Sequence, residues 1–216
     1  MNMSKRLAGT GILLFLVFEN LFAFQSNNGR VNVPDTAVIE NEFVRVYKNT
    51  AACTAASTPG FGSRVIVALE KVKIKSSRGK LKLSRGNIAV FKEGEWYVIP
   101  KGAFFEVALK KNHPPLKQPE QWIEPLKNAM VYEDEQFRVF EERLAPGDDR
   151  ELHSHAQRVV VRLNEVQLTD PRFYPNGQPG QGIQVPDTVR FAEPILHAVR
   201  NLSKIPLFNI VIEFKI

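Results

Sequence analysis

The chain has 216 residues, of which 44% are hydrophobic, so it is long enough to bury one large core or two small ones. Its formal net charge of +6 is mild and comes with no aromatic-rich basic motif or zinc-finger spacing, which argues against a nucleic-acid-binding protein. A single cysteine, Cys53, excludes a disulfide within the chain, so stability must come from core packing.

The amino-terminal segment, residues 1–23, has the pattern of a secretory signal peptide. Lys5 and Arg6 precede the run LAGTGILLFLVF, which is short for a membrane span, and Leu21-Phe22-Ala23 offers a cleavage site. An uncleaved anchor is the competing interpretation. Cleavage near Ala23 would leave a polar lead over residues 24–37 and a periplasmic or secreted protein without membrane attachment.

An internal repeat covers most of the remaining chain. VIENEFVRVY, from Val38, aligns with VYEDEQFRVF, from Val131, and SRVIVALEKVKI, from Ser63, aligns with QRVVVRLNEVQL, from Gln157. The spacing of about ninety-four residues is the size of a small domain rather than of a solenoid unit. The sequence therefore predicts two domains of one fold with a Pro-rich linker between them. The predicted bounds are 38–110 for the first domain, 111–129 for the linker and 130–216 for the second domain.

Short strands dominate both repeats. Runs of Val, Ile and Phe are interrupted by Gly, Pro and Asn, a pattern typical of antiparallel sandwiches and barrels. In KVKIKSSRGKLKL, from Lys71 to Leu83, cations alternate with apolar residues, which predicts a hairpin with one solvated face. The clearest helix candidate, PEQWIEPLKNA from Pro119, is short and contains Pro125. We therefore predict an all-β protein.

Three of the four histidines are candidate metal ligands. His153 and His155 open the run ELHSHAQRVVV, and alternate residues of a strand share one face. Farther along, that face is apolar, as expected for the inside of a barrel. Buried imidazoles need a hydrogen-bond partner or a metal, since an unpaired buried polar group costs a few kcal/mol. Neutral imidazole is a common metal ligand. Because two ligands are too few for tight binding, His197, on a later apolar strand, is the expected third ligand.

Other polar residues receive different interpretations. Gln157 shares the face of the histidine pair and is a candidate weak fourth ligand, or a hydrogen-bond partner of the ligands. Arg158 and Arg162 fall on the opposite face and are expected to point outward. Arg64 recurs at the place of Arg158 in the first repeat, which favours domain or subunit packing over catalysis. His113, in the linker, is expected to be exposed to solvent.

These residues make the chain resemble a two-domain cupin. The first cupin motif reads Gly, five residues, His-x-His, three or four residues, Glu. The segment from Gly147 to His155 has the spacing of its opening, whereas valines occupy 159 and 160, where the glutamate belongs.

The second cupin motif reads Gly, five residues, Pro-x-Gly, two residues, His, three residues, Asn. It is divided between the repeats. The second repeat keeps the tail as His197 and Asn201, and Phe105 of the first repeat stands where the histidine belongs. The head of the motif is kept in the first repeat by Gly94, Pro100 and Gly102.

The resemblance implies two tandem jelly-roll barrels, the first degenerate and the second holding one divalent metal ion on His153, His155 and His197. Zinc, iron, manganese, nickel and copper are not separable on such ligands. Together with the predicted signal peptide, it implies an exported metal-binding protein with a small-molecule pocket in the second barrel. Cupins include oxygenases, isomerases and lyases, so the fold does not fix the chemistry.

A non-catalytic ligand-binding or structural cupin with a vestigial metal site is the alternative. No inward carboxylate is expected beside the histidine pair, so no general base is identified and enzymatic activity stays open. The expected partner is a small molecule and not a nucleic acid, and assembly as a homodimer stays open.

Overall fold

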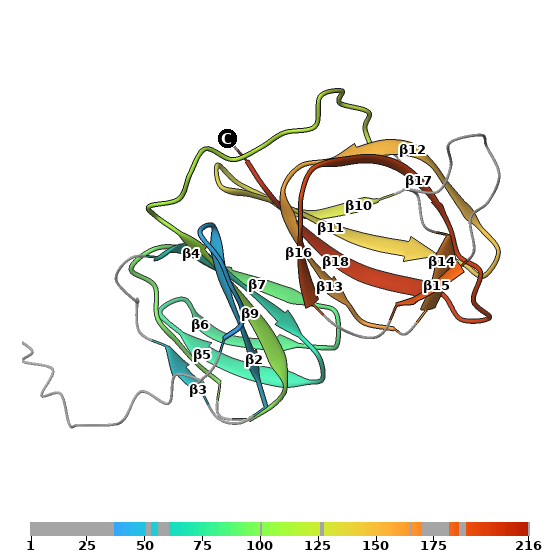
Figure 1. Ribbon diagram of the computed structural model, residues 1–216. Coiled ribbons are helices and arrows are strands. Elements are labelled where there is room, and N and C mark those ends of the chain that lie inside the picture. The colour runs from blue at the N-terminus through green and yellow to red at the C-terminus, as the bar shows by residue number, and fades with distance from the viewer. Residues whose placement is uncertain are drawn as a thin grey trace, which may run out of the picture. The chain divides into compact units, whose positions relative to one another are not determined.

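The computed structural model describes residues 37–50, 53–55, 61–99, 101–125, 128–164, 166–169, 182–185 and 189–215. All regular structure in these ranges is β-strand (Figure 1), which confirms the predicted all-β class. They contain no helix of the length and apolarity that a membrane crossing requires. The predicted signal peptide, residues 1–23, and the polar lead up to residue 36 lie outside the described residues.

The first half of the chain, from β1 to β9, forms two antiparallel sheets. The larger sheet contains, in spatial order, β1 (Ala37–Glu40), β2 (Val44–Asn49), β9 (Phe104–Lys110), β4 (Phe61–Ala68) and β7 (Ile88–Phe91). The smaller sheet contains β3 (Cys53–Ala55), β8 (Tyr97–Ile99), β5 (Val72–Ser76) and β6 (Gly79–Leu83). In the β5–β6 hairpin Val72 and Ile74 are buried while the lysines of both strands are exposed, which confirms the predicted solvated face.

The second half, from β10 to β18, repeats this order. Its larger sheet contains β10 (Ala129–Glu133), β11 (Phe137–Leu144), β18 (Leu207–Phe214), β13 (Arg158–Arg162) and β16 (Val189–Ala192). Two smaller antiparallel pairs join β12 (Asp149–His155) to β17 (Ile195–Arg200) and β14 (Val166–Thr169) to β15 (Gly182–Val185). By position in this order, β18 is the counterpart of β9, and β17 is the counterpart of β8.

The sequence repeat coincides with a repeated hairpin. Glu40 on β1 lies opposite Arg45 on β2 and forms an ion pair with it. Glu133 on β10 lies opposite Arg138 on β11, with the carboxylate oxygen 3.3 Å from Nε. Both hairpins also shift register at the equivalent place. The alternating pattern of this hairpin thus specifies the same pairing twice.

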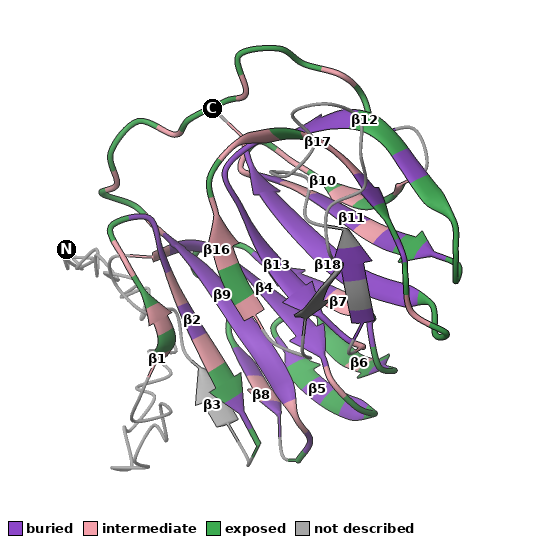
Figure 2. Cartoon of the chain, turned by 45° about the vertical axis from the view of Figure 1, so that its right-hand side comes forward, coloured by how far each residue is buried: buried purple, intermediate pink, exposed green. Residues whose placement is uncertain are grey.

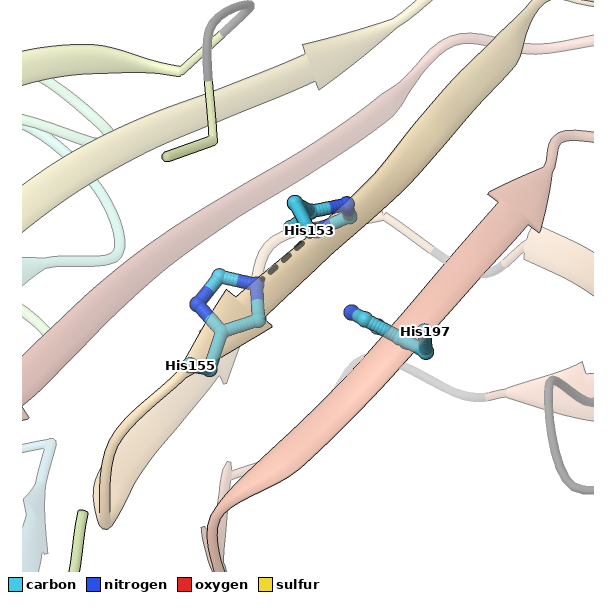
Figure 3. Close-up of side chains that lie close together, drawn as sticks. All are labelled: His153, His155 and His197. Carbon is cyan, nitrogen blue, oxygen red and sulfur yellow. Dashed lines mark hydrogen bonds between the residues drawn. The ribbon is translucent and has the colours of Figure 1, made fainter. Parts of the chain in front are cut away.

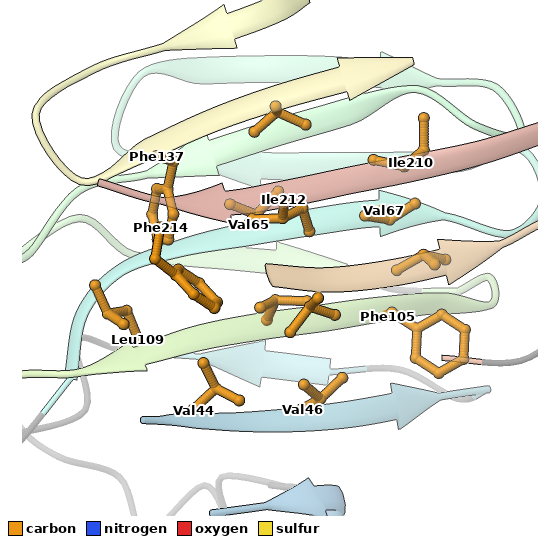
Figure 4. Close-up of a cluster of buried hydrophobic side chains, with 14 of the residues drawn as sticks. Val44, Val46, Val65, Val67, Phe105, Leu109, Phe137, Ile210, Ile212 and Phe214 are labelled. Atoms are coloured by element: carbon orange, nitrogen blue, oxygen red, sulfur yellow. The ribbon is translucent and has the colours of Figure 1, made fainter. Parts of the chain in front are cut away.

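The two larger sheets share one hydrophobic core. Their central strands β4, β9, β13 and β18 are buried along nearly their whole length (Figure 2). Valine, isoleucine and phenylalanine side chains from both halves meet in one cluster (Figure 4). Val65 and Val107 contribute from the first half, and Val159, Val161 and Ile212 from the second. A valine face expected to line a barrel interior therefore packs against the other half of the chain.

The opposite faces of these sheets enclose two different interiors. In the first half the interior is filled by a hydrophobic cluster that includes Ile66, Phe91 and Phe104. The second half contains two smaller apolar clusters, one of which is Phe140, Val160 and Val211, beside buried polar side chains. In the described ranges, buried histidines therefore lie only in the second interior, although Arg64 and Glu106 are also buried in the first half.

The segment between β9 and β10 runs along the second half without regular structure. Residues 111–125 and 128 form neither strand nor helix, so the helix candidate from Pro119 is not helical where it is described. Ile123 and Ser154 exchange two hydrogen bonds of 2.9 Å, one through the Ser154 hydroxyl, which fixes this segment to β12. His113 is half-buried, and its Nδ1 lies 2.7 Å from the Pro114 carbonyl oxygen.

Candidate metal centre

Strands β12 and β17 bring the three predicted histidines together (Figure 3). His153 and His197 lie directly opposite in this antiparallel pair, and His155 follows two residues later on the same face. The ring centroid of His153 lies 4.8 Å from that of His155 and 4.5 Å from that of His197. One nitrogen from each ring lies within 4.8 Å of the others, so small side-chain shifts would bring all three within reach of one ion, whose bonds to imidazole are about 2.0–2.1 Å long.

Hydrogen bonds orient two of the imidazoles toward each other. The Nδ1 of His153 lies 2.6 Å from the carbonyl oxygen of Glu151, and the Nδ1 of His155 lies 2.5 Å from a carboxylate oxygen of Glu213. A carbonyl only accepts, so Nδ1 of His153 carries the hydrogen and Nε2 keeps its lone pair in the neutral ring. The two Nε2 atoms lie 3.1 Å apart. A carbonyl or carboxylate on the far nitrogen is the arrangement that orients metal-binding histidines.

His197 is the third member and lacks a hydrogen-bond partner. Both of its ring nitrogens are buried, and neither is paired within the described part of the chain. Leaving such groups unpaired costs about 1–3 kcal/mol each. Coordination to a metal ion would satisfy one of these nitrogens, so the orphaned ring fits the role of a ligand.

Burial keeps all three rings neutral. Desolvation lowers the pKa of His153 below its ordinary value, that of His155 to about 3 and that of His197 to about 2. Nearby Arg158 adds to the effect at His155. Neutral imidazole is the form that coordinates metals, so the site is in its ligating form at physiological pH.

The expected orientation of the arginines is wrong. β12 and β13 lie in different sheets, and the chain bends between them at Ala156 and Gln157, so the alternation of faces does not continue through the run. Arg158 and Arg162 are buried and line a cavity of about 40 Å³ beside the histidines, called here the inner cavity. Its lining includes Glu142, His155, Arg158, Val160, Arg162 and His197.

Arg64, in the first half, is also buried rather than outward. Its Nη2 donates to the carbonyl oxygen of Glu95 at 2.5 Å, and its guanidinium lies 5.2 Å from the ring centroid of Tyr97. Tyr97 in turn donates a hydrogen bond to the buried carboxylate of Glu106. The arginine that recurs in the repeat therefore packs inside its own half in each case.

Gln157 does not accompany the histidines, contrary to the expectation. Its amide oxygen accepts a hydrogen bond of 2.8 Å from the Lys117 backbone, and its amide nitrogen donates to Glu193 at 3.2 and 3.3 Å. The bend at this residue turns the side chain away from the His155 face. Gln157 therefore ties the connecting segment to the β16–β17 turn.

Two buried carboxylates overturn the expectation that none lies near the histidines. Glu213, on β18, contacts His155, and Glu142, on β11, lines the inner cavity and accepts a 2.7 Å hydrogen bond from Asn209. Burial raises the pKa of Glu213 to about 7, although Arg158 opposes this shift. In the sequence, Glu213 could have been recognised as a single acid inside an apolar strand, NIVIEFKI. Neither residue occupies the position of the missing cupin glutamate.

Gly147 and Asn201, from the two cupin motifs, have structural roles. Gly147 has a φ of +79°, which favours glycine, and its N–H donates to the Asn201 carbonyl oxygen at 2.8 Å. The Asn201 amide donates to the carbonyl oxygens of Leu144 and Ile205. The expected match of Phe105 to His197 is wrong, because Phe105 lies on β9 in the shared core and not on β8. Segments of unequal length between the strands displaced that alignment.

Glu213→Gln is expected to weaken zinc binding about 10–100-fold, the usual effect of losing a carboxylate that orients a ligating histidine. The neutral amide keeps the shape of the side chain but lacks the carboxylate charge that would favour a hydrogen on Nδ1 of His155 when its Nε2 binds a metal ion. Competition with a chromophoric chelator measures the affinity. Glu93→Gln, an exposed acid of the first half, is the control. Equal affinity in the parent and in Glu213→Gln would show that Glu213 does not position the ligand.

No protein-family model matches the sequence, and no curated protein sequence matches it. Among solved structures, the chain is similar to a cupin 2 conserved barrel domain protein from Leptotrichia buccalis, with a TM-score of 0.54 and 12% identity over 83% of this chain and 88% of that one. AerE from Microcystis aeruginosa gives a TM-score of 0.54 and 12% identity over 81% and 88%. An oxalate decarboxylase gives a TM-score of 0.51 and 12% identity over 81% of this chain and 70% of that one. This chain therefore has the same jelly-roll fold as these cupin structures.

Proposed function

We propose that the second half binds one divalent transition-metal ion through His153, His155 and His197, and that the inner cavity receives a small molecule beside it. The observation that carries the proposal is the orientation of the histidine pair, whose Nδ1 atoms are held by Glu151 and Glu213 while their Nε2 atoms converge. Three neutral nitrogen ligands suit zinc, iron, manganese, nickel or copper and leave coordination positions open for water or a bound molecule.

The chemistry of such a site follows from the residues around it. When bound, the ion would act as a Lewis acid toward an oxygen atom of the bound molecule. Glu213 contacts the His155 ring, and Arg158 and Arg162 line the inner cavity. One protein of similar fold is an oxalate decarboxylase, which is a lyase. Cupins also include oxygenases and isomerases, so the proposed activity belongs to one of these three classes. Ligand binding without catalysis is the competing role.

Elemental analysis tests the metal site directly. The purified protein is offered each first-row divalent ion in turn, desalted and analysed, with an expected content of about one ion per chain. A protein that stays empty after every ion would refute the metal site and leave the ligand-binding role.

We also propose that the protein is exported and processed near Ala23. The support is the basic pair Lys5-Arg6, the apolar run that follows it and the small residue at the expected cut. Amino-terminal sequencing of protein from its native host is expected to start close to Phe24. A mature chain that still begins at Met1 would contradict cleavage and favour an anchored form.

A further inference from the structure

We propose that the inner cavity binds a small carboxylate, of the size of formate or acetate, through the guanidinium of Arg162. This inference rests on the proposed function, which makes the cavity a ligand site. It deepens that function by naming the class of molecule that the cavity binds. The charges and donors that support it belong to the chain itself and are present with or without a metal ion.

The wall of the inner cavity carries an excess of positive charge. Arg158, Arg162 and Arg190 line it together with one carboxylate, that of Glu142; Arg158 and Arg162 are buried, whereas Arg190 is exposed, and Glu213 offsets part of the charge of Arg158. The histidines are neutral, and a divalent metal ion would add two further positive charges. Buried charges of one sign are costly unless a counter-ion compensates them. A ligand that matches this wall is therefore an anion.

Arg162 is the guanidinium with unused donors. Its side chain is only 3% exposed, and its Nε and Nη1 have no hydrogen-bond partner in the described ranges. Arg158, by contrast, donates to the carbonyl oxygens of Ala156 at 3.1 Å and Glu193 at 2.8 Å. Burial lowers the pKa of Arg162 only to about 10, so the group stays charged at neutral pH. Charge-assisted hydrogen bonds to carboxylate oxygens would satisfy these donors.

The size of the inner cavity limits the ligand. A cavity needs at least about 10–15 Å³ to hold one water molecule. The inner cavity, at about 40 Å³, therefore accommodates roughly three groups of that size. Formate and acetate have about this number of heavy atoms, whereas sugars and aromatic acids are far larger. Val160 and Val211 also line the cavity and provide an apolar contact for a C–H or methyl group. A carboxylate of one or two carbons combines the required charge and size.

The test is calorimetric titration of acetate into the zinc-loaded and the metal-free protein. Acetamide, which has the same shape without the charge, is the control ligand, and inorganic phosphate is the larger anion. We expect acetate to bind and acetamide not to bind. Arg162→Gln is expected to weaken acetate binding about tenfold or more, the effect of losing a charged hydrogen bond. Arg143→Gln, at an exposed arginine of β11, should leave it unchanged.

Several outcomes would overturn the carboxylate site. They are equal acetate affinity in the parent and Arg162→Gln, binding of phosphate in preference to acetate, and absence of acetate binding in both metal states. If Arg162→Gln does not fold by circular dichroism, Arg162→Met supplies the comparison with a long apolar side chain.

Elemental analysis of the same samples separates the two proposals. Metal without acetate binding refutes only the carboxylate site. Acetate binding to a protein that never takes up metal supports the carboxylate site and refutes the metal site.

Discussion

His197→Ala is expected to abolish stoichiometric metal binding, and His153→Ala and His155→Ala are expected to do the same. Two imidazoles cannot enclose an ion that three hold. The loss of affinity should therefore exceed the roughly 10–100-fold that follows from removing a hydrogen-bond partner of a ligand. The measurement is metal content after desalting, combined with chelator competition for any variant that retains metal.

The fold of the metal-free protein should survive this substitution. Neither ring nitrogen of His197 has a hydrogen-bond partner among the described residues, so alanine removes no paired polar group. Circular dichroism before and after heating checks this point. His113→Ala is the matched control, because His113 lies in the connecting segment with its Nδ1 on the Pro114 carbonyl oxygen. Full metal content in His197→Ala, or loss of metal in His113→Ala, would contradict the three-histidine site.

Phe137→Ala is expected to lower the free energy of unfolding by about 3–5 kcal/mol, the usual cost of truncating a fully buried phenylalanine. Phe137 is fully buried in the core that the two larger sheets share, and its ring centroid lies 6.0 Å from that of Phe214. The cluster also contains first-half residues such as Val65 and Val107. The substitution should therefore destabilise both halves together rather than the second half alone.

Two tryptophans allow each half to be followed separately. Trp96 lies between β7 and β8 of the first half, and Trp122 lies under the guanidinium of Arg138 from the second half, 5.3 Å from the ring. Single-tryptophan versions, made with Trp96→Phe or Trp122→Phe, should show the same urea midpoint and the same shift on Phe137→Ala. Met130→Ala, at an exposed position of β10, should change stability by no more than about 0.5 kcal/mol. Separate midpoints at the two tryptophans would contradict a cooperative shared core.

Several features of this protein follow from local sequence pattern. The alternating segment from Lys71 to Leu83 predicts its hairpin, since lysines on one face and aliphatic residues on the other fix which face is wet. The repeated Glu40 and Glu133 hairpins follow for the same reason. The His-x-His spacing places His153 and His155 on one face whatever the surroundings, because strand alternation is a local property of the backbone.

The polar surroundings of the histidines depend on the tertiary structure. Strand β13 is buried on both sides, with Val159 in the shared core and Val160 in the interior of the second half, so no alternation of polarity marks its inner face. A bend before Arg158 then reverses the faces that the preceding residues define. Counting alternate residues along the strand from the histidines therefore predicts the wrong side for Arg158 and Arg162.

The partner of His155 is likewise decided only by the fold. Glu213 stands out in its apolar strand, but 58 residues separate it from His155, and nothing in the strand itself says which group it meets. Pairing β18 with β13 places that carboxylate beside the end of β12. Local spacing thus determined which histidines share a face, whereas the packing of sheets distant in sequence determined the carboxylate and arginines around them, because burial on both faces removes the pattern from which they could be predicted.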